Sequence, residues 1–499
     1  MLLVKKEAAM ESIWSRTYSL RKKDALHSDV AADAAVIGGG MAGILTAYQL
    51  ERAGMRTVVL EAERIGSGQT KGTTAKITSQ HGMFCRSFIE KKGIDTAEKY
   101  VRANQEAVEE FKKTVQREKI DCDLEETASY VYSDNEEELI QESEAAGKLG
   151  VCASLEKKVE IPVPCAGAVR FEHQAQFHPL KFLGALAEGL TVYENSPVTE
   201  VEEQLIRTPC GSVRADSIIF ASHYPFINFP GMYFTRMHQE RSYVLALEGA
   251  GNIEGMYIGS GPDALSFRQY GKYLLIGGRV HRTGENKEGG KYEELRNRAR
   301  ILYPGSRETA CWSAQDCITA DQIPFIGQYA PGRPHWFAAS GFQKWGMTSS
   351  MVSAMILSDI ICGRQNPYAD IFSPERFSAE ELPQIMKDGG KAVKGLIKRF
   401  FHIPGETVNL IEPGHAAVVE TAQGKAGVYK TEENKVFQVD IVCPHLGCQL
   451  VWNPDERTWD CPCHGSRFDY EGNLLEGPAQ EGIHYELFFG EQFSPFSSL

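Results

Sequence analysis

Two short stretches near the C-terminus combine cysteine and histidine at a spacing that suits a metal site. Cys443 and His445 lie in the first stretch, Cys461 and His464 in the second, and both stretches contain Pro and Gly, which hold ligands rigidly. Two thiolates and two imidazoles are acceptable to zinc. Common zinc fingers, however, bring their cysteine pair and their histidine pair on separate segments, whereas here each stretch brings one of each.

This mixed arrangement resembles the Rieske iron–sulfur family, in which two cysteines hold one iron of a [2Fe–2S] cluster and two histidines hold the other. The resemblance implies that Cys443 and Cys461 bind the first iron and that His445 and His464 bind the second. A zinc knuckle or a simple disulfide pair is the alternative interpretation.

The resemblance extends to residues around the four ligands. Cys448 and Cys463 match the two extra cysteines that form a disulfide between the cluster loops in Rieske proteins of quinol-oxidising complexes. Ser466 matches the hydroxyl that donates a hydrogen bond to the cluster, and Gly477 with Pro478 resembles the third, shielding loop. Phe468 is a departure, because the respiratory members carry Tyr there. Since a lost hydrogen bond to a cluster sulfur ligand makes reduction harder, we expect a lower reduction potential.

A second informative pattern lies near the N-terminus. A short apolar strand over 33–37 leads into glycines at Gly38, Gly40 and Gly43, then a helical pattern that closes at Gly54 and a second strand that ends at Glu61. This βαβ unit places the glycines in the register that lets a pyrophosphate approach a helix N-terminus, with the acid placed to accept hydrogen bonds from the ribose hydroxyls. A purely structural βαβ unit is the alternative.

The segments that follow resemble the family of D-amino-acid oxidase, glycine oxidase and sarcosine oxidase, over residues 33 to about 372. Thr73 and Thr74 lie in a polar, Gly-rich loop of the sort that wraps a flavin nucleotide, and Gly341, Gly346 and Met347 open a long apolar helix. In the family that helix N-terminus faces the pyrimidine side of FAD. Its amides and dipole would stabilise the negative charge of the reduced flavin. The other matching segments are 176–179, 217–223, 273–278 and 321–327.

The expected fold class is α/β: a Rossmann-like FAD-binding domain, a discontinuous α+β substrate domain with an antiparallel sheet, and a C-terminal all-β Rieske domain. The helical spacing between Ala97 and Val115 and the alternation over 243–247 support the middle part. The expected boundaries are an N-terminal extension 1–32, FAD-binding segments 33–83, 160–230 and 317–372, substrate segments 84–159 and 231–316, a linker 373–402, and a Rieske domain 403–499.

The substrate-contacting residues are poorly defined by sequence. In the resembled oxidases a basic residue anchors a substrate carboxylate, and Arg241, Arg268 and Arg279 lie in the corresponding region. Taken singly, each is more easily explained as a surface arginine. Cys317 lies where some sarcosine oxidases attach flavin covalently, but its neighbours do not match that motif.

Charge and composition narrow the partners. The net charge is −13, and the part from residue 403 onward holds fifteen acidic and five basic residues. This acidity argues against nucleic acid as a partner. It would suit a basic electron-transfer partner, or it is simply a solvated surface that keeps the protein in solution. A basic amphipathic helix expected over 387–401 would suit a membrane surface, but we favour a helix that covers its own domain. We recognise no signal peptide and no membrane span. The eight cysteines before Cys443 have no disulfide-framework spacing, which suits a reducing compartment, and we therefore expect a cytoplasmic protein.

Together these patterns predict an FAD- and Rieske-dependent oxidoreductase. A small organic substrate, with an amine or amino acid as the favoured class, would reduce FAD, and electrons would leave singly through the cluster to an external acceptor, so that a dehydrogenase is favoured over an oxidase. The alternatives are a ferredoxin-fed reductase that runs in the opposite direction and a redox sensor or electron-transfer module without turnover. Substrate, acceptor and oligomeric state are not encoded in any recognisable motif.

Overall fold

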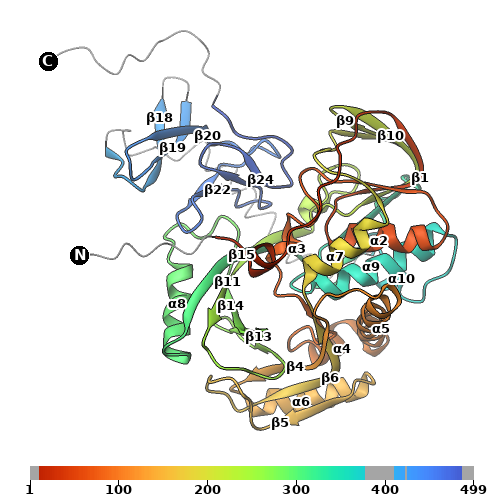
Figure 1. Cartoon of the computed structure of the whole chain (residues 1–499), viewed down its shortest axis with the longest axis vertical. Coiled ribbons are helices and arrows are strands. Elements are labelled where there is room, and N and C mark those ends of the chain that lie inside the picture. Colours follow the sequence, from red (N-terminus) through yellow and green to blue (C-terminus); the bar gives the residue numbers. More distant parts are fainter. Residues whose placement is uncertain (1–9, 377–409, 422–423, 486–499) are drawn as a thin grey trace. The chain divides into compact units, whose positions relative to one another are not determined.

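The computed structural model describes residues 10–376, 410–421 and 424–485, and the chain divides into two compact units (Figure 1). Unit 1 comprises Met1–Arg282 and Gly290–Gly389, and unit 2 comprises Thr283–Gly289 and Gly390–Leu499. Within the described residues, no helix has the length and apolar character needed to cross a bilayer. The basic helix expected over 387–401 lies outside the described residues.

A mainly parallel sheet forms the first layer of unit 1. Its strand order is β16-β17-β10-β1-β2-β7, and β1 pairs in parallel with β2 on one side and with β10 on the other. Every residue of β2 and the last four of β1 are buried, as expected for a parallel sheet covered on both faces. The strands of this sheet are β1 Val30–Ile37, β2 Thr57–Leu60, β7 Thr191–Tyr193, β8 Glu200–Glu202, β9 Leu205–Thr208, β10 Gly211–Phe220, β16 Phe325–Gln328 and β17 Trp336–Ser340.

A second, mostly antiparallel sheet belongs to the same unit. Its order is β15-β11-β14-β13-β12-β4-β6-β3, with β5 paired to β6. Its strands are β3 Lys76–Ile77, β4 Glu125–Ser133, β5 Ala153–Glu156, β6 Gly167–Gln176, β11 Met237–Glu248, β12 Met256–Gly259, β13 Ser266–Tyr270, β14 Tyr273–Arg282 and β15 Arg307–Thr319. This sheet draws β3 and β6 from segments that the sequence assigned to the FAD-binding domain, so the two layers share more of the chain than expected.

Helices join the two layers through one large apolar core. α2 packs against α9 and against β1 and β2, and α5 packs against α9. The expected periodicity of α5 is confirmed, and the buried Asn104 is accommodated because its amide donates to the Tyr100 carbonyl, 2.9 Å away. The helices of unit 1 are α1 Ile13–Thr17, α2 Met41–Arg52, α3 Gln69–Gly72, α4 Cys85–Lys92, α5 Ile94–Glu118, α6 Glu136–Lys148, α7 Pro179–Glu188, the 3₁₀ turn η1 Tyr233–Thr235, α8 Lys291–Leu302, α9 Gly346–Ile361 and α10 Ala369–Phe372.

The expected N-terminal extension is in part an integral piece of unit 1. Trp14, in α1, is fully buried, and its indole N–H donates to the Thr73 carbonyl at 2.7 Å. Thr17 hydrogen-bonds His178, whose other ring nitrogen accepts from the Lys181 amide and caps α7. With Pro179 at the first helical position, this cap explains why α7 begins where it does.

Unit 2 is β-rich, as predicted for the C-terminal domain. Its two sheets run β18-β19-β20 and β21-β22-β23-β24, all antiparallel. The strands are β18 Ala416–Thr421, β19 Gly424–Lys430, β20 Val436–Asp440, β21 Val451–Asn453, β22 Thr458–Asp460, β23 Arg467–Asp469 and β24 Leu474–Glu476. The loops between β20 and β21, and between β22 and β23, carry the four expected cluster ligands.

An ion pair ties the segment after α10 to the turn between β15 and β16. Arg376 Nε lies 2.7 Å from an Asp321 carboxylate oxygen, and its guanidinium also donates to the Pro324 carbonyl. Burial raises the pKa of Asp321, but the charge and hydrogen bonds of Arg376, with the Ile323 amide, outweigh burial and hold that pKa below its usual range. The carboxylate therefore stabilises the fold above the unfolded-state pKa of about 3.9, and this contribution is lost as pH falls through the lower, folded-state pKa.

We predict that Arg376→Ala lowers the free energy of unfolding by about 3–5 kcal/mol, because it leaves the buried Asp321 carboxylate without its cation. Arg364→Ala is the matched control, since Arg364 pairs with Asp359 at 2.8 Å on the surface and should contribute about 0–1 kcal/mol. Denaturant unfolding at neutral pH measures both. Equal losses in the two variants would contradict this account of Asp321.

Candidate functional site

The turn between β1 and α2 is shaped by glycines at two positions where a side chain cannot fit. At Gly38, with φ +113°, an added Cβ would lie 2.5 Å from the Ala221 carbonyl oxygen, and at Gly43 it would collide with the Gly38 carbonyl oxygen. Gly40 differs, since its Cβ would make only ordinary contact with Thr70, at 3.4 Å. The fold itself does not require glycine at 40, so the open space there fits a group bound at the N-terminus of α2.

Glu61, at the end of β2, faces this turn. Its carboxylate accepts from the Gly39 amide at 2.6 Å and from the Glu63 amide at 2.9 Å. Burial raises the pKa of Glu61 although both amides oppose the rise. A carboxylate has further lone pairs after these two bonds, so Glu61 retains capacity for the ribose hydroxyls that the sequence assigned to it.

The loop with Thr73 and Thr74 is held by two side chains from distant segments. Trp14 donates to the Thr73 carbonyl, and the Arg268 guanidinium donates to the carbonyls of Thr74 and Ala75. Ala75 adopts a left-handed conformation with φ +56°, which a side chain rarely takes without such support. The loop is therefore fixed from both sides before any cofactor binds.

The helix α9 begins at Gly346, as expected, and follows the turn at Gly341. Gly341 has φ +72°, and a Cβ there would collide with Thr319. Around Gly346 an added Cβ would meet no atom within 4 Å, and no side chain caps the helix, whereas Met347 is buried. The first turn of α9 thus has open space beside its amides, which fits the expected flavin edge.

The two cluster loops of unit 2 have the same backbone design. In the first loop the Cys443 amide donates to the Cys448 carbonyl at 2.9 Å, and the Gly447 amide donates back to the Cys443 carbonyl at 2.9 Å. In the second loop the amides of Cys461 and Gly465 repeat both bonds, to the carbonyls of Ser466 and Cys461, at 2.8 and 3.0 Å. Each loop therefore presents its cysteine and histidine from one closed turn.

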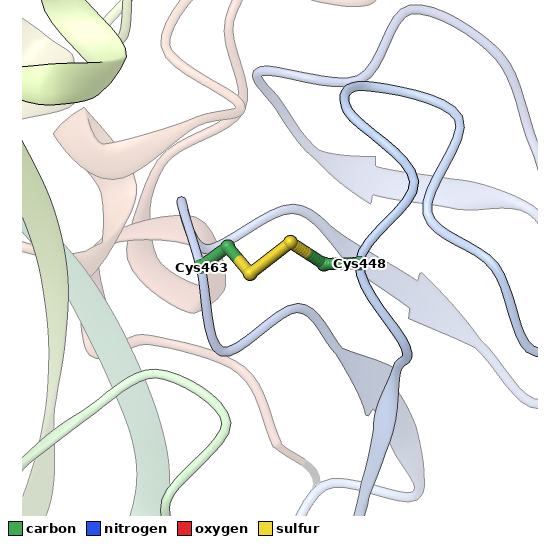
Figure 2. The surroundings of a disulfide bond; sticks show 2 residues. All are labelled: Cys448 and Cys463. Carbon is green, nitrogen blue, oxygen red and sulfur yellow. A yellow bond between two sulfur atoms is a disulfide. The ribbon is translucent and has the colours of Figure 1, made fainter. Parts of the chain in front are cut away.

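A disulfide joins these two loops, as the sequence predicted. Cys448 and Cys463 are bonded, and Figure 2 shows the bond between the two segments that carry them. The Cys461 sulfur lies within 4.8 Å of both disulfide sulfurs. The bond thus holds the loops together at the place where the ligands meet.

The ligand side chains are paired by type. The Cys461 thiol, with the Ser466 hydroxyl, lowers the pKa of Cys443 although burial opposes it. The Cys443 thiol and burial raise the pKa of Cys461. The rings of His445 and His464 meet edge-on with centroids 4.9 Å apart, and burial lowers the pKa of His445 to about 4, so it is a neutral imidazole. Two thiols that meet and two imidazoles that meet fit a [2Fe–2S] cluster with different ligands on its two irons.

Residues beside the ligands close the site. Ser466 accepts a hydrogen bond from the Ala479 amide at 3.0 Å, which ties the third loop to the second and leaves the hydroxyl proton to donate toward sulfur. Phe468 is fully buried and lies opposite Trp459 across β22 and β23. Arg467, which the sequence analysis did not single out, is buried within 3.1 Å of carboxylate oxygens of Glu456 and Asp460.

Comparison with known families now identifies both halves of the chain. The model of the family described as FAD dependent oxidoreductase matches residues 33–360, and that of the Rieske [2Fe-2S] domain matches residues 405–486. The chain belongs to the FAD-dependent oxidoreductase family. It carries a C-terminal Rieske domain, and its cofactors are FAD and a Rieske-type [2Fe–2S] cluster, as the sequence predicted.

One relative aligns with almost the whole chain. YhfW of Bacillus subtilis (strain 168), which carries the name of a Rieske 2Fe-2S iron-sulfur protein, is 37% identical over 94% of this chain and 96% of its own. Glycine oxidase from Geobacillus kaustophilus has a TM-score of 0.60 and 19% identity over 70% of this chain and 100% of its own. L-proline dehydrogenase from P. horikoshii has a TM-score of 0.60 and 19% identity, and the match covers 70% of this chain and 98% of its own. The two solved structures establish the shared fold of the FAD-dependent part.

The three candidate arginines occupy different environments. Arg268 is buried and donates also to Gln176 and to the Phe177 carbonyl, so its guanidinium serves the flavin loop, and burial lowers its pKa to about 9. Arg279 pairs with the exposed Asp263 at 2.8 Å. Arg241 is 1% exposed and donates to Gln315 and Ser313.

A network of polar side chains, which the sequence analysis did not predict, surrounds Arg241. Gln315 donates to Gln239 at 2.7 Å, Gln239 contacts His223 at 3.1 Å, and His223 lies 3.3 Å from the Cys317 sulfur. These residues face one another because β11 and β15 pair Gln239 with Cys317 and Arg241 with Gln315. Polar residues at every second position in two strands were the available signal.

On the opposite face of the same strand pair lies an ion cluster. Glu240 and Asp316 are register partners, and Lys344 Nζ lies 3.0 Å from Glu240 and 3.2 Å from Asp316. Burial raises the pKa of Glu240, but His238 and Lys344 outweigh it and bring that pKa to about 2. Lys344 belongs to the turn before α9, so this cluster connects the second sheet to the expected flavin edge.

We predict that Gly43→Ala lowers the affinity for FAD by about tenfold or more, because the new methyl must push α2 away from the Gly38 carbonyl. The helical glycine Gly147 is the control, since its Cβ would meet nothing, and Gly147→Ala should stabilise α6 by about 0.5–1 kcal/mol. Flavin fluorescence during dialysis measures retention. Equal retention in both variants would contradict the assigned role of this turn.

We predict that Phe468→Tyr raises the midpoint potential of the cluster. A hydroxyl that donates to a charged sulfur contributes about 1.5 kcal/mol, equivalent to about 60 mV for a one-electron couple. Phe437→Tyr, on the three-stranded sheet, makes the same chemical change outside the cluster loops and should leave the potential unchanged. Redox titration followed by electron paramagnetic resonance tests both, and no rise in Phe468→Tyr would refute the explanation.

Proposed function

We propose that this protein is a dehydrogenase that oxidises a small amine or amino acid at FAD and passes the electrons, one at a time, through its Rieske cluster to an external acceptor. The observation that carries the proposal is the completeness of both sites in one chain. The glycine turn, the acid and the anchored loop proposed for FAD lie in unit 1, and the four cluster ligands, three of them buried, lie with their disulfide in unit 2.

The two cofactors differ in the electrons they handle. FAD accepts a hydride equivalent of two electrons, whereas a [2Fe–2S] cluster takes one electron at a time. A cluster within an amine-oxidising chain provides an outlet other than dioxygen, which favours a dehydrogenase over an oxidase. The name of the similar L-proline dehydrogenase structure is in keeping with this choice.

Both the fold and the residues around Arg241 support an amine or amino acid as the substrate class. The similar structures carry the names glycine oxidase and L-proline dehydrogenase, so amino acids and small amines are the first class to test. In this chain the buried Arg241, held by Gln315, is the cation available to bind a substrate carboxylate.

The acceptor is proposed to be a one-electron carrier. The acidic part from residue 403 onward would suit a carrier with basic residues around its own redox centre, since complementary charge accelerates encounter. Such association would weaken with ionic strength.

An anaerobic substrate screen tests the proposal. Wild-type protein and Cys461→Ser are mixed with glycine, L-proline, sarcosine or a primary amine, and flavin absorbance is followed with reduction of an added one-electron acceptor. At least one substrate should bleach the flavin in both proteins at similar rates. Acceptor reduction should fall about tenfold or more in Cys461→Ser, because that variant lacks a cluster ligand.

Two other results would contradict the proposal. If no amine reduces the flavin but reduced ferredoxin bleaches it, the protein is a reductase in which electrons flow in the opposite direction. Flavin that responds to neither would indicate a redox sensor without turnover.

A further inference from the structure

The compact unit that contains the cluster loops includes a segment from far earlier in the chain. Residues Thr283–Gly289 follow β14 and precede α8 in sequence, yet they cluster with unit 2. Thr283 and Asn286 are 1% and 4% exposed, and Gly284 is buried. A loop that joins a strand to a helix is normally exposed, so burial at three of its positions requires an explanation.

Gly284 packs directly on the backbone of the second cluster loop. It has φ +80°, and an added Cβ would lie 2.6 Å from the Cα and 2.7 Å from the nitrogen of Pro462. Pro462 stands between the ligand Cys461 and the disulfide residue Cys463. Because the nearest atoms are backbone, no side-chain rotation could relieve the clash, and only glycine permits this approach.

Asn286 connects the same segment to the strands that carry the second loop. Its amide nitrogen donates to Asn453 at 3.1 Å and to Asp455 at 2.8 Å. Asn453 in turn donates to Asp460 at 3.0 Å, and Asp460 accepts from Arg467 at 3.1 Å. Asp460 and Arg467 are the residues immediately before and after the loop 461–466, so the chain of bonds ends at both of its stems.

A third contact completes the support. At Gly289, with φ +71°, an added Cβ would lie 2.7 Å from Pro454, in the turn after β21. Within unit 2, the segment therefore contacts the part that carries the cluster loops at its beginning, middle and end, through two glycines and one buried amide.

We propose that Thr283–Gly289 is a fourth supporting loop of the Rieske site, in which Gly284 and Asn286 are positioning residues that hold the second cluster loop and keep water from its backbone. The inference does not depend on the substrate or on the direction of electron flow. Solvent exposure and hydrogen bonding around a cluster set its reduction potential. Since burial disfavours the more negative reduced state, loosening this segment should make the cluster easier to reduce.

The decisive comparison uses two full-length variants with the same backbone strain. Gly284→Ala places a methyl against Pro462, whereas Gly251→Ala places one at an exposed turn with the same φ of +80° and no atom within 4 Å. Midpoint potential and the paramagnetic spectrum of the reduced cluster are measured for both. We expect Gly284→Ala to shift the one-electron equilibrium about tenfold toward the reduced form, about 60 mV, and Gly251→Ala to match the wild type.

A third variant keeps the test decisive if Gly284→Ala fails to load its cluster. Asn286→Ala removes the bonds to Asn453 and Asp455 without a backbone clash and should shift the potential in the same direction. Faster reduction of the Cys448–Cys463 disulfide by dithiothreitol is expected in the same variant, since Cys463 follows the supported Pro462. If the potential and spectrum of Asn286→Ala equal those of the wild type, the supporting role is refuted.

Discussion

The Rieske part of this protein depends on two short loops that must meet at one point. Neither loop has regular secondary structure, so each is closed by its own pair of backbone hydrogen bonds and the two are then joined by the Cys448–Cys463 bond. This arrangement places two sulfurs together and two imidazoles together, which is the ligand distribution of a Rieske cluster. The buried charges of Arg467, Asp460 and Glu456 fix the stems of the second loop, because a buried cation is stable only when its partners stay in place.

The FAD-dependent part must also hold an irregular loop in position, and it does so with other contacts. Its flavin loop includes a left-handed Ala75 and is held by hydrogen bonds from Trp14 and Arg268, residues far away in sequence. The glycine turn needs Gly38 and Gly43 for its own packing and leaves the face at Gly40 open. In both parts, then, buried side chains keep the backbone around the cofactor in position. Such preorganisation is what precise cofactor placement requires.

Local sequence patterns were enough to predict the fold class and both cofactors. The βαβ unit, the helix α5 and the cluster ligands depend on spacing within short segments, and the fold class and cofactors followed from them. The supports could not be predicted, since they arise from tertiary pairing: Arg268 reaches Ala75 across 193 positions, and Asn286 reaches Asn453 across 167. A candidate substrate anchor thus turned out to support the flavin loop, and the polar chain around Arg241 emerged only from the register of β11 and β15.

We propose that one chain oxidises its substrate at FAD and passes the electrons of the reduced flavin to its own cluster. Rapid freezing after anaerobic mixing with a substrate that bleaches the flavin, followed by electron paramagnetic resonance, tests it most directly. The signal of the reduced cluster should rise after the flavin absorbance falls. Because transfer occurs within one molecule, its rate should be independent of protein concentration. A cluster that stays oxidised while the flavin is fully reduced, or a rate that increases with protein concentration, would contradict it.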